Sequence, residues 1–343
     1  MKGLIVTQDH QLRLANDIPV PTPGEYDALV RVECAMICNG TDNEIRHGTL
    51  AEIRDYPVML GHESAGHIIR VGKKVRNYQL GDLVSRTIVR TNEKYASGWG
   101  AFCEYGLVTD YHAMVSDGFT DAQRYTIGYM QGTYPDGISA EEACMMITFK
   151  EVYSAFCRMN LCRDDRIMII GDGPVGLSMV QIAKMLGVKE IYLVGQNPDA
   201  MEFARKAGAT EVFNDLSPAD RSELKKRCAR RITQYIDAVG LNKTTLQGQA
   251  FLENGGMINV YGLRSGRDLH LPLEGMLRNW GIRYMQFPIH ALEGAAHKPI
   301  CDAVLQKKLD ARAMITHRLP IAEYQEGFDL IDQKKALKVV LYF

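Results

Sequence analysis

The chain has 343 residues, which is long enough for two domains, and its 46% apolar and 24% charged residues are ordinary for a globular protein. A formal net charge of −1 gives no electrostatic reason to expect nucleic acid or an anionic membrane as a partner. No apolar run reaches the length of a membrane-spanning helix, and the N-terminal stretch has no apolar segment typical of a signal peptide, so we expect a cytoplasmic protein.

Short β-type runs separated by turn signals fill the first 120 residues. The stretch TPGEYDALVRVECAMI has a Pro-Gly turn and then alternates from Leu29 to Cys34, and SAGHIIRVGKKV and GDLVSRTIV repeat the pattern. This pattern predicts an all-β or barrel-like lobe.

The pattern changes near residue 140, where Ser139 followed by acidic residues signals the start of a helix. After it, DRIMIIG is typical of a buried strand in a parallel sheet. Helical and strand-like segments then alternate, as GPVGLSMVQIAKMLG, IYLVG, PDAMEFARKAG and GGMINVYG. This alternation predicts an α/β, doubly wound sheet. The basic stretch 221–231 is interpreted as the solvated face of one of its helices.

A Gly-x-Gly-x-x-Gly motif follows the strand DRIMIIG and opens the next helix. Its residues are Gly171, Asp172, Gly173, Pro174, Val175 and Gly176. The first glycine permits a tight turn, the second permits close approach of a pyrophosphate, and the third permits close packing of helix and strand. The helix N-terminus attracts the phosphates. The motif therefore predicts a dinucleotide-binding site.

The end of the second strand bears on the choice between NAD and NADP. In NAD sites this strand usually ends in an acid that binds the ribose 2′-hydroxyl. Here LVGQNPD places Gly195 at that position, and Asp199 lies too far into the next helix to replace the acid. Loss of the acid permits a 2′-phosphate, which Gln196 and Asn197 can bind. The pattern favours NADP, and since no arginine follows directly it leaves NAD open.

A possible metal site is suggested by Cys38, in AMICNGTD, and by His62 and Glu63, in GHESAG. Thiolate and imidazole are natural ligands of Zn²⁺, and the carboxylate can act as a ligand or orient the site. From these residues alone, a buried cysteine and a loop histidine remain the alternative. The eight cysteines contain no C-x-x-C pair, so we expect no structural zinc.

Five segments, in order, resemble the zinc-type medium-chain dehydrogenase/reductase family of alcohol, polyol and sugar dehydrogenases. They are LVRVECAMICNGTD, PVMLGHESAGHIIRVGKKVRNYQLGDLV, GWGAFCEYGLV, GDGPVGLSMVQIAKMLG and ITHRLPIAEYQEGFDLIDQKKALKVVL, and the resemblance runs over nearly the full chain. It implies a GroES-like β-barrel catalytic domain at 1–149, a Rossmann NAD(P)-binding domain with a doubly wound parallel sheet at 150–288, and a return to the catalytic domain at 289–343.

The resemblance also implies roles for residues of the site. Cys38 and His62 would bind one catalytic zinc, Glu63 would be a ligand or a close neighbour of it, and Thr41 would relay a proton from the substrate oxygen. Zinc would polarise that oxygen while a hydride passes to the nicotinamide. Glu44 and His47 resemble positions that line the substrate pocket of sugar dehydrogenases.

The sequence departs from the family pattern at two places in this site. Cys-Asn-Gly-Thr-Asp has one residue more than the family's Cys-Gly-Thr-Asp, so the loop after the cysteine must bulge. Where the family places a third zinc ligand, this chain has Ile147. Cys144 and Glu151 lie one helical turn away and are alternative ligands. Glu63 can instead complete a site with one open position.

These features together predict a zinc-dependent NAD(P) oxidoreductase. We expect it to interconvert a secondary alcohol and a ketone on a polyol, sugar or cyclitol-like small molecule, as a homodimer or homotetramer. One alternative is a zinc-free medium-chain reductase that acts on a quinone or an activated double bond. Another is a non-catalytic nucleotide-binding relative. The presence of the metal pair together with the cofactor loop favours the dehydrogenase.

Overall fold

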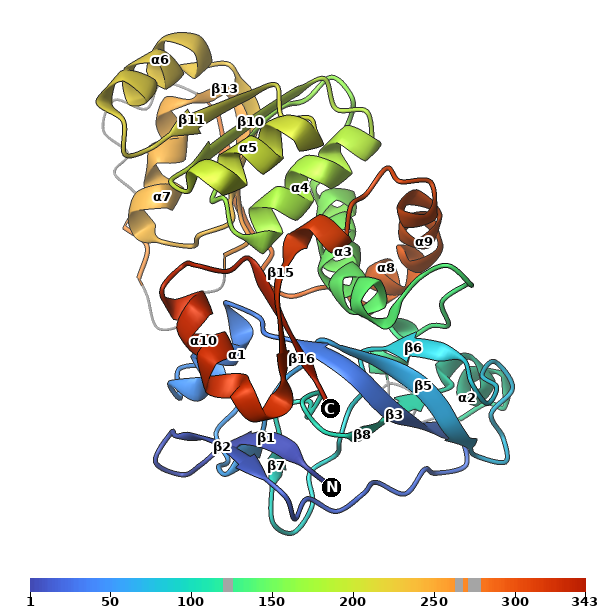
Figure 1. Cartoon of the computed structure of the whole chain (residues 1–343). Coiled ribbons are helices and arrows are strands. Elements are labelled where there is room, and N and C mark those ends of the chain that lie inside the picture. Colours follow the sequence, from blue (N-terminus) through green and yellow to red (C-terminus); the bar gives the residue numbers. More distant parts are fainter. Residues whose placement is uncertain (120–125, 263–267, 271–278) are drawn as a thin grey trace. The chain divides into compact units, whose positions relative to one another are not determined.

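The computed structural model divides the chain into two compact units (Figure 1). One contains Met1–Lys150 and Ile289–Phe343, and the other contains Glu151–Pro288. Helix α3 (Ala140–Met159) runs from the first unit into the second. The structure describes residues 1–119, 126–262, 268–270 and 279–343.

The first unit is built on two β-sheets, with strand orders β2-β1-β4-β7 and β15-β16-β3-β5-β6. Strand β8 also belongs to the second sheet, where it pairs antiparallel with β3. The strands are β1 (Gly3–Val6), β2 (Leu12–Ala15), β3 (Asp27–Met36), β4 (Val58–Met59), β5 (Ser64–Val71), β6 (Leu83–Ser85), β7 (Ala96–Ser97), β8 (Tyr105–Thr109), β15 (Ile315–Pro320) and β16 (Lys338–Tyr342). The C-terminal strand β16 pairs antiparallel with β3, so the end of the chain completes the N-terminal sheet.

The first unit also contains short helices. They are α1 (Thr41–Arg46), α2 (Tyr111–Ser116), α8 (His290–Ala295), α9 (His297–Leu305) and α10 (Tyr324–Asp332), with 3₁₀ turns η3 (Arg312–Met314) and η4 (Ile321–Glu323). In the middle of β3 the exposed side chains of Arg31 and Glu33 alternate with the buried Val32 and Cys34, as the period of a strand requires. This confirms the β-rich N-terminal lobe.

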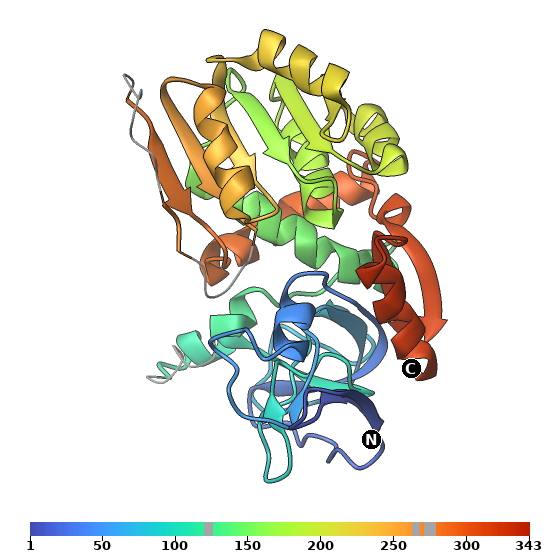
Figure 2. The same cartoon turned by 90° about the vertical axis from the view of Figure 1, so that its left-hand side faces the viewer.

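The second unit contains a six-stranded sheet in the order β11-β10-β9-β12-β13-β14, in which all neighbouring strands are parallel. Its strands are β9 (Arg166–Ile170), β10 (Glu190–Gly195), β11 (Glu211–Asn214), β12 (Ile232–Asp237), β13 (Leu252–Val260) and β14 (Gly281–Tyr284). They run side by side in the upper part of Figure 2. The chain starts in the middle of the sheet at β9, winds outward to β11, and then winds the other way from β12, so the doubly wound Rossmann fold is confirmed.

Helices connect the strands of this sheet. They are α4 (Pro174–Met185), α5 (Pro198–Ala207), α6 (Pro218–Cys228) and α7 (Asn242–Gln247), followed by the 3₁₀ turn η2 (Gly248–Ala250). Local signals fix their starts, since the side chains of Asn197 and Ser217 accept backbone hydrogen bonds at the first turns of α5 and α6. Within the described ranges, no helix has the length and apolar character needed to cross a bilayer.

Candidate metal centre and cofactor site

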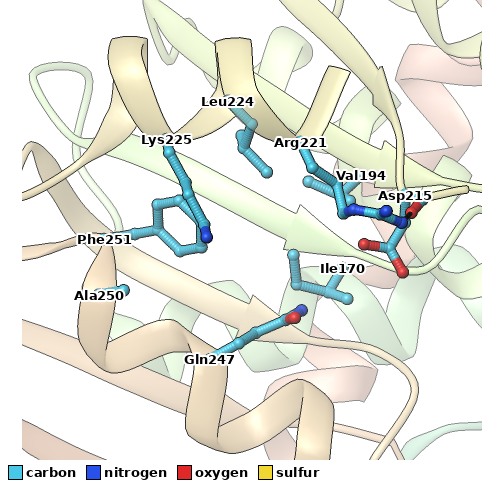
Figure 3. A pocket seen from close by; sticks show the side chains of 9 residues that line it. All are labelled: Ile170, Val194, Asp215, Arg221, Leu224, Lys225, Gln247, Ala250 and Phe251. Atoms are coloured by element: carbon cyan, nitrogen blue, oxygen red, sulfur yellow. Dashed lines mark hydrogen bonds between the residues drawn. The ribbon is translucent and has the colours of Figure 1, made fainter. Parts of the chain in front are cut away.

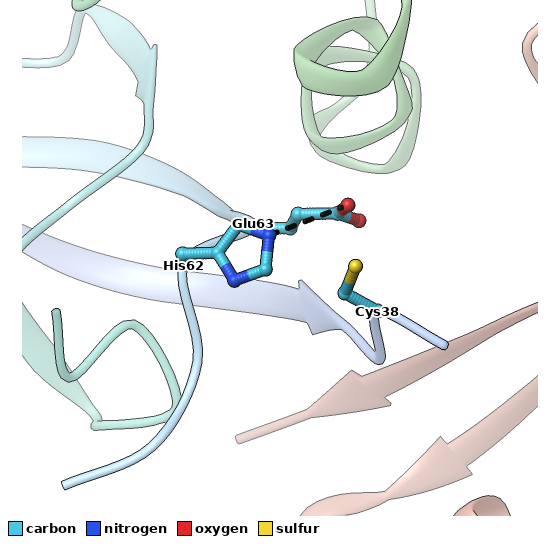
Figure 4. A group of neighbouring side chains, drawn as sticks. All are labelled: Cys38, His62 and Glu63. Carbon is cyan, nitrogen blue, oxygen red and sulfur yellow. Dashed lines mark ion pairs between the residues drawn. The ribbon is translucent and has the colours of Figure 1, made fainter. Parts of the chain in front are cut away.

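Three potential metal ligands meet in the first unit (Figure 4). Cys38 follows the end of β3, and His62 and Glu63 directly precede the start of β5. Because β3 and β5 are antiparallel, with Ala35 opposite Ser64, the residues after one strand and before the other become neighbours. One ligand atom from each of the three residues lies within 4.8 Å of the other two. Among the described residues, these three form the one group found that could hold a metal ion.

Asp42 lies close to both Cys38 and the imidazole of this group. Its Oδ2 accepts a hydrogen bond of 2.8 Å from the backbone N–H of Cys38, and its Oδ1 lies 3.5 Å from Nδ1 of His62. Nε2 of His62 lies on the side of Glu63, 3.9 Å from Oε1. Among the described residues, neither Oδ1 of Asp42 nor Nδ1 of His62 has a hydrogen-bond partner. A tautomer with its proton on Nδ1, facing Asp42, would leave the lone pair of Nε2 for a metal.

The charges around His62 suit a divalent cation. Burial alone would lower the pKa of His62, but the neighbouring Cys38 and Asp42 raise this pKa well above its usual range. A cationic form of the buried ring is thus stabilised by its anionic surroundings. A metal ion can supply that positive charge while the imidazole stays neutral. Thiolate, imidazole and carboxylate are all donors that zinc accepts, so the residues present fit this metal.

Glu63 is held by two further buried side chains. Nζ of Lys338, the first residue of β16, donates to Oε2 of Glu63, and the hydroxyl of Thr148 in α3 donates to Oε1 at 3.3 Å. The side chains of Lys338 and Glu63 are only 3% and 2% exposed. Each oxygen of the Glu63 carboxylate therefore has a side-chain partner that fixes its position in the ligand group. Sequence reasoning missed Lys338, although a lysine at the start of the apolar strand KVVLY was a visible signal.

The alternative third ligands do not join this group. Cys144 is fully buried in α3, and burial together with the adjacent Cys34 raises the pKa of its thiol well above the usual range. Cys144 is not among the three residues whose ligand atoms approach one another. Glu151 lies on the same helix, where α3 enters the second unit, and is not part of the group either.

The other predicted residues of the catalytic site lie in or directly after α1. Thr41 is the first residue of this helix and directly precedes the buried Asp42. The Glu44 carboxylate accepts a hydrogen bond from the hydroxyl of Thr49, and Nδ1 of His47 lies 2.8 Å from a backbone carbonyl oxygen of the same helix. Both thus have local partners, and neither they nor Thr41 belong to the ligand group.

The predicted cofactor loop joins β9 to α4 in the second unit. Gly171 has a φ of +113°, a conformation that side chains rarely adopt, and Gly173 caps α4 with open space around the position of a Cβ. A Cβ on Gly176 would lie 1.9 Å from the carbonyl oxygen of Gly171. Pro174 occupies the first turn of α4, where its missing N–H costs nothing. The loop thus has the turn, the open approach and the close packing that the motif predicts.

Replacing Gly176 by alanine is expected to lower the free energy of unfolding by about 3 kcal/mol, because the added methyl group overlaps backbone that cannot move freely. Chemical denaturation measures this loss. The matched control is Gly173→Ala, which adds its methyl group to open space and should leave stability within about 0.5 kcal/mol of the wild type. Equal stability of the two variants would contradict the packing role of Gly176.

The end of β10 is occupied by a carboxylate from the cofactor loop. Oδ2 of Asp172 accepts hydrogen bonds of 2.6 Å from the backbone N–H groups of both Gln196 and Asn197. A Cβ on Gly195 would lie 2.6 Å from the same oxygen. The glycine that ends β10 therefore leaves the space into which Asp172 reaches. The residues at the end of the second strand do not by themselves indicate that the neighbouring loop supplies an acid there.

A pocket lies beside this loop in the second unit (Figure 3). Ile169 lies near Gly176 of α4, so the next residue, Ile170, faces the opposite side of the sheet, toward α6 and η2. The pocket there is mainly apolar with charged groups at its edge. Its lining residues are Ile170, Val194, Asp215, Arg221, Leu224, Lys225, Gln247, Ala250 and Phe251.

Comparison with known proteins identifies the family. The model of the zinc-binding dehydrogenase domain matches residues 174–287, and that of the alcohol dehydrogenase GroES-like domain matches residues 24–138. The chain belongs to the zinc-type medium-chain dehydrogenase/reductase family, whose members are oxidoreductases.

Similar proteins cover the chain from end to end. L-threonine 3-dehydrogenase of Francisella tularensis subsp. mediasiatica is 26% identical over 96% of this chain and 95% of its own length. Sorbitol dehydrogenase of Bombyx mori is 24% identical over 95% of this chain and 94% of its own. The fold is shared with the crystal structure of an alcohol dehydrogenase from Escherichia coli CFT073 complexed with NADH. That structure has a TM-score of 0.80 at 22% identity and covers 100% of this chain and 99% of its own.

Proposed function

We propose that the chain is a zinc-dependent NAD(P) dehydrogenase that interconverts a secondary alcohol and a ketone on a polyol, sugar or cyclitol-like substrate. The observation that carries this proposal is the approach of Cys38, His62 and Glu63 to within 4.8 Å of one another. The similar L-threonine 3-dehydrogenase and sorbitol dehydrogenase support it, since both are named for small hydroxylated molecules.

The residues of the first unit would prepare the substrate oxygen. Cys38, His62 and Glu63 would hold zinc, and one coordination position would remain for substrate. Zinc, when bound, supplies a Lewis acid that polarises the substrate oxygen. Asp42, which lies 3.5 Å from Nδ1 of His62, would favour the tautomer that presents Nε2. Thr41, beside Asp42 at the start of α1, is proposed to carry the proton away from the substrate hydroxyl.

The residues of the second unit would bind the dinucleotide that exchanges hydride with the substrate carbon. The open approach at Gly173 and the N-terminus of α4 suit the pyrophosphate. The apolar walls formed by Ile170, Val194 and Phe251 suit the adenine ring. Gly195, Gln196 and Asn197 at the end of β10 would then lie where the adenosine ribose is bound.

A zinc-free reductase that acts on a quinone or an activated double bond is the second candidate within this family. The donor groups in the first unit disfavour such a reductase. A reductase without metal has no use for three donor groups arranged around one point, or for Asp42 directed at the histidine. A non-catalytic nucleotide-binding relative is disfavoured for the same reason.

A substrate screen tests the proposal. We expect polyols, sugars or cyclitols to reduce NAD or NADP when added to protein whose zinc content has been measured, with L-threonine and simple alkyl alcohols as comparison substrates. Formation of the reduced cofactor is followed by its absorbance. Reduction by none of the hydroxylated compounds, on a sample that contains zinc and binds the cofactor, would overturn the polyol assignment.

A further inference from the structure

We propose that Asp172 takes the place of the missing acid at the end of the second Rossmann strand and makes this enzyme prefer NAD(H) to NADP(H). The inference rests on the proposed function, because it assumes that a nicotinamide dinucleotide binds at this loop. It assigns the choice between the two cofactors to a residue of the glycine-rich loop, whereas that choice usually depends on the last residue of the second strand.

The position of the Asp172 carboxylate is set by two backbone donors. Its Oδ2 is 2.6 Å from the amide nitrogens of Gln196 and Asn197, the two residues that follow β10. The carboxylate is therefore anchored at the end of the strand, although it belongs to the preceding βα loop. Oδ1 has no hydrogen-bond partner among the described residues. That oxygen remains available to accept a hydrogen bond from a ribose hydroxyl group.

The side chain of Asp172 occupies the space that a side chain at position 195 would need. A Cβ at position 195 would lie 2.6 Å from Oδ2, 2.7 Å from Cγ and 2.7 Å from Cβ of Asp172. An acid on the strand and an acid at position 172 thus cannot occupy this place together. The glycine that removes the strand's own acid is what admits the acid of the loop. A negative charge therefore lies at the end of β10, as in the usual NAD site, but it comes from the glycine-rich loop and not from the strand.

This arrangement acts against a 2′-phosphate in two ways. The backbone N–H groups of Gln196 and Asn197, which would otherwise be suitable donors for the phosphate, are already engaged by Oδ2. The ionised carboxylate also repels a dianion at the same place, and this repulsion is strong because one side of the site is formed by protein. A ribose 2′-hydroxyl meets neither obstacle, since it can donate a hydrogen bond to the carboxylate.

Two cationic side chains near the site would favour NADP(H). Arg221 and Lys225 line the neighbouring pocket and could attract a 2′-phosphate. Arg221 is partly engaged, because its Nη1 donates to the carbonyl oxygen of Asp215. Both side chains belong to exposed residues of α6, where water and salt weaken their attraction. The anchored carboxylate at the end of β10 is therefore expected to dominate.

Binding of NADH and NADPH to the purified wild-type protein and to Asp172→Asn tests the inference without any substrate. Dissociation constants are measured by the fluorescence of the bound nicotinamide and by calorimetry. The wild type should bind NADH roughly 10- to 100-fold more tightly than NADPH, because only NADH can form a hydrogen bond from its ribose hydroxyl to the charged carboxylate. Asp172→Asn keeps an oxygen for the two backbone amides but loses the charge, so the preference should shrink to within roughly threefold or reverse.

Asp199→Asn is the matched control. Asp199 is exposed in the first turn of α5, two residues beyond Asn197, and its carboxylate has no described bond to the loop. Loss of this charge should leave the ratio of the two dissociation constants unchanged. Equal shifts in Asp172→Asn and Asp199→Asn would show a general charge effect and would overturn the specific role of Asp172. A wild type that prefers NADPH, and loses this preference in Arg221→Ala, would overturn it as well.

Moving the acid back to the strand gives a second test. Gly195→Asp alone is expected to destabilise the loop and to weaken the binding of both cofactors, because the new side chain meets Asp172. In Asp172→Gly/Gly195→Asp the space is vacated, and the preference for NADH should return. Failure of the double variant to recover the preference, while circular dichroism and melting show it folded, would contradict the inference. A wild type that binds neither dinucleotide would refute the proposed function itself.

Discussion

Cys38→Ser is expected to lose the bound metal and to reduce kcat/KM roughly a thousandfold, because several kcal/mol of transition-state stabilisation depend on a polarised substrate oxygen. The thiolate is the only sulfur donor of the ligand group, and a serine hydroxyl does not ionise at neutral pH to replace it. His62→Ala should have the same effect. Metal analysis and steady-state kinetics on the same samples measure both losses.

The control for this pair is Cys157→Ser, which changes an exposed cysteine on α3 that has no place in the ligand group. It should keep the wild-type metal content and rate. The dinucleotide should still bind to Cys38→Ser with wild-type affinity, because the glycine-rich loop lies in the second unit. Full activity of Cys38→Ser without metal would show that the reaction does not use this site.

In the metal-free protein, Lys338→Met is expected to lower the free energy of unfolding by about 3–5 kcal/mol, since it leaves the Glu63 carboxylate buried without its cation. Burial alone would lower the pKa of Lys338, but Glu63 raises this pKa above its ordinary value. The ion pair therefore contributes its full stability at neutral pH. On the alkaline side, that contribution declines as the pH rises from the pKa of an unfolded lysine to the raised pKa of Lys338. Urea denaturation at pH 7 measures the effect.

A double-mutant cycle separates this pairing from other effects of the substitution. In Glu63→Gln/Lys338→Met both charges are gone, so the double variant should be more stable than Lys338→Met alone. Lys335→Met, at an exposed position shortly before β16, is the matched control and should change stability by less than about 0.5 kcal/mol. Additive effects of Glu63→Gln and Lys338→Met would mean that the two side chains do not stabilise each other.

The strand and helix pattern of the second unit was predictable because its signals are local. DRIMIIG, which ends in the first glycine of the motif, and the two glycines after it specify a strand, a turn and a helix within a dozen residues, and the structure contains β9, the turn at Gly171 and α4. Cys38, His62 and Glu63 were also named from the sequence. Their proximity, however, depends on the pairing of β3 with β5, which the sequence does not state.

The features that escaped prediction all involve partners far apart in the chain. Lys338 pairs with Glu63 only because the C-terminal strand joins the N-terminal sheet. Asp172 replaces the acid missing at Gly195 only because the parallel pairing of β9 and β10 brings their ends together. The sequence shows which acid is absent from its usual position. A structure is needed to show which other acid fills the space.

X-ray absorption at the zinc edge tests the central claim most directly, because it reports the atoms that bind the metal. The wild-type protein should contain one zinc per chain, with one sulfur ligand at about 2.3 Å and the remaining ligands nitrogen or oxygen at about 2.0–2.2 Å. The sulfur contribution should vanish in Cys38→Ser. An active wild-type enzyme without zinc, or a zinc bound only by nitrogen and oxygen, would contradict the assignment of Cys38, His62 and Glu63 as the metal site.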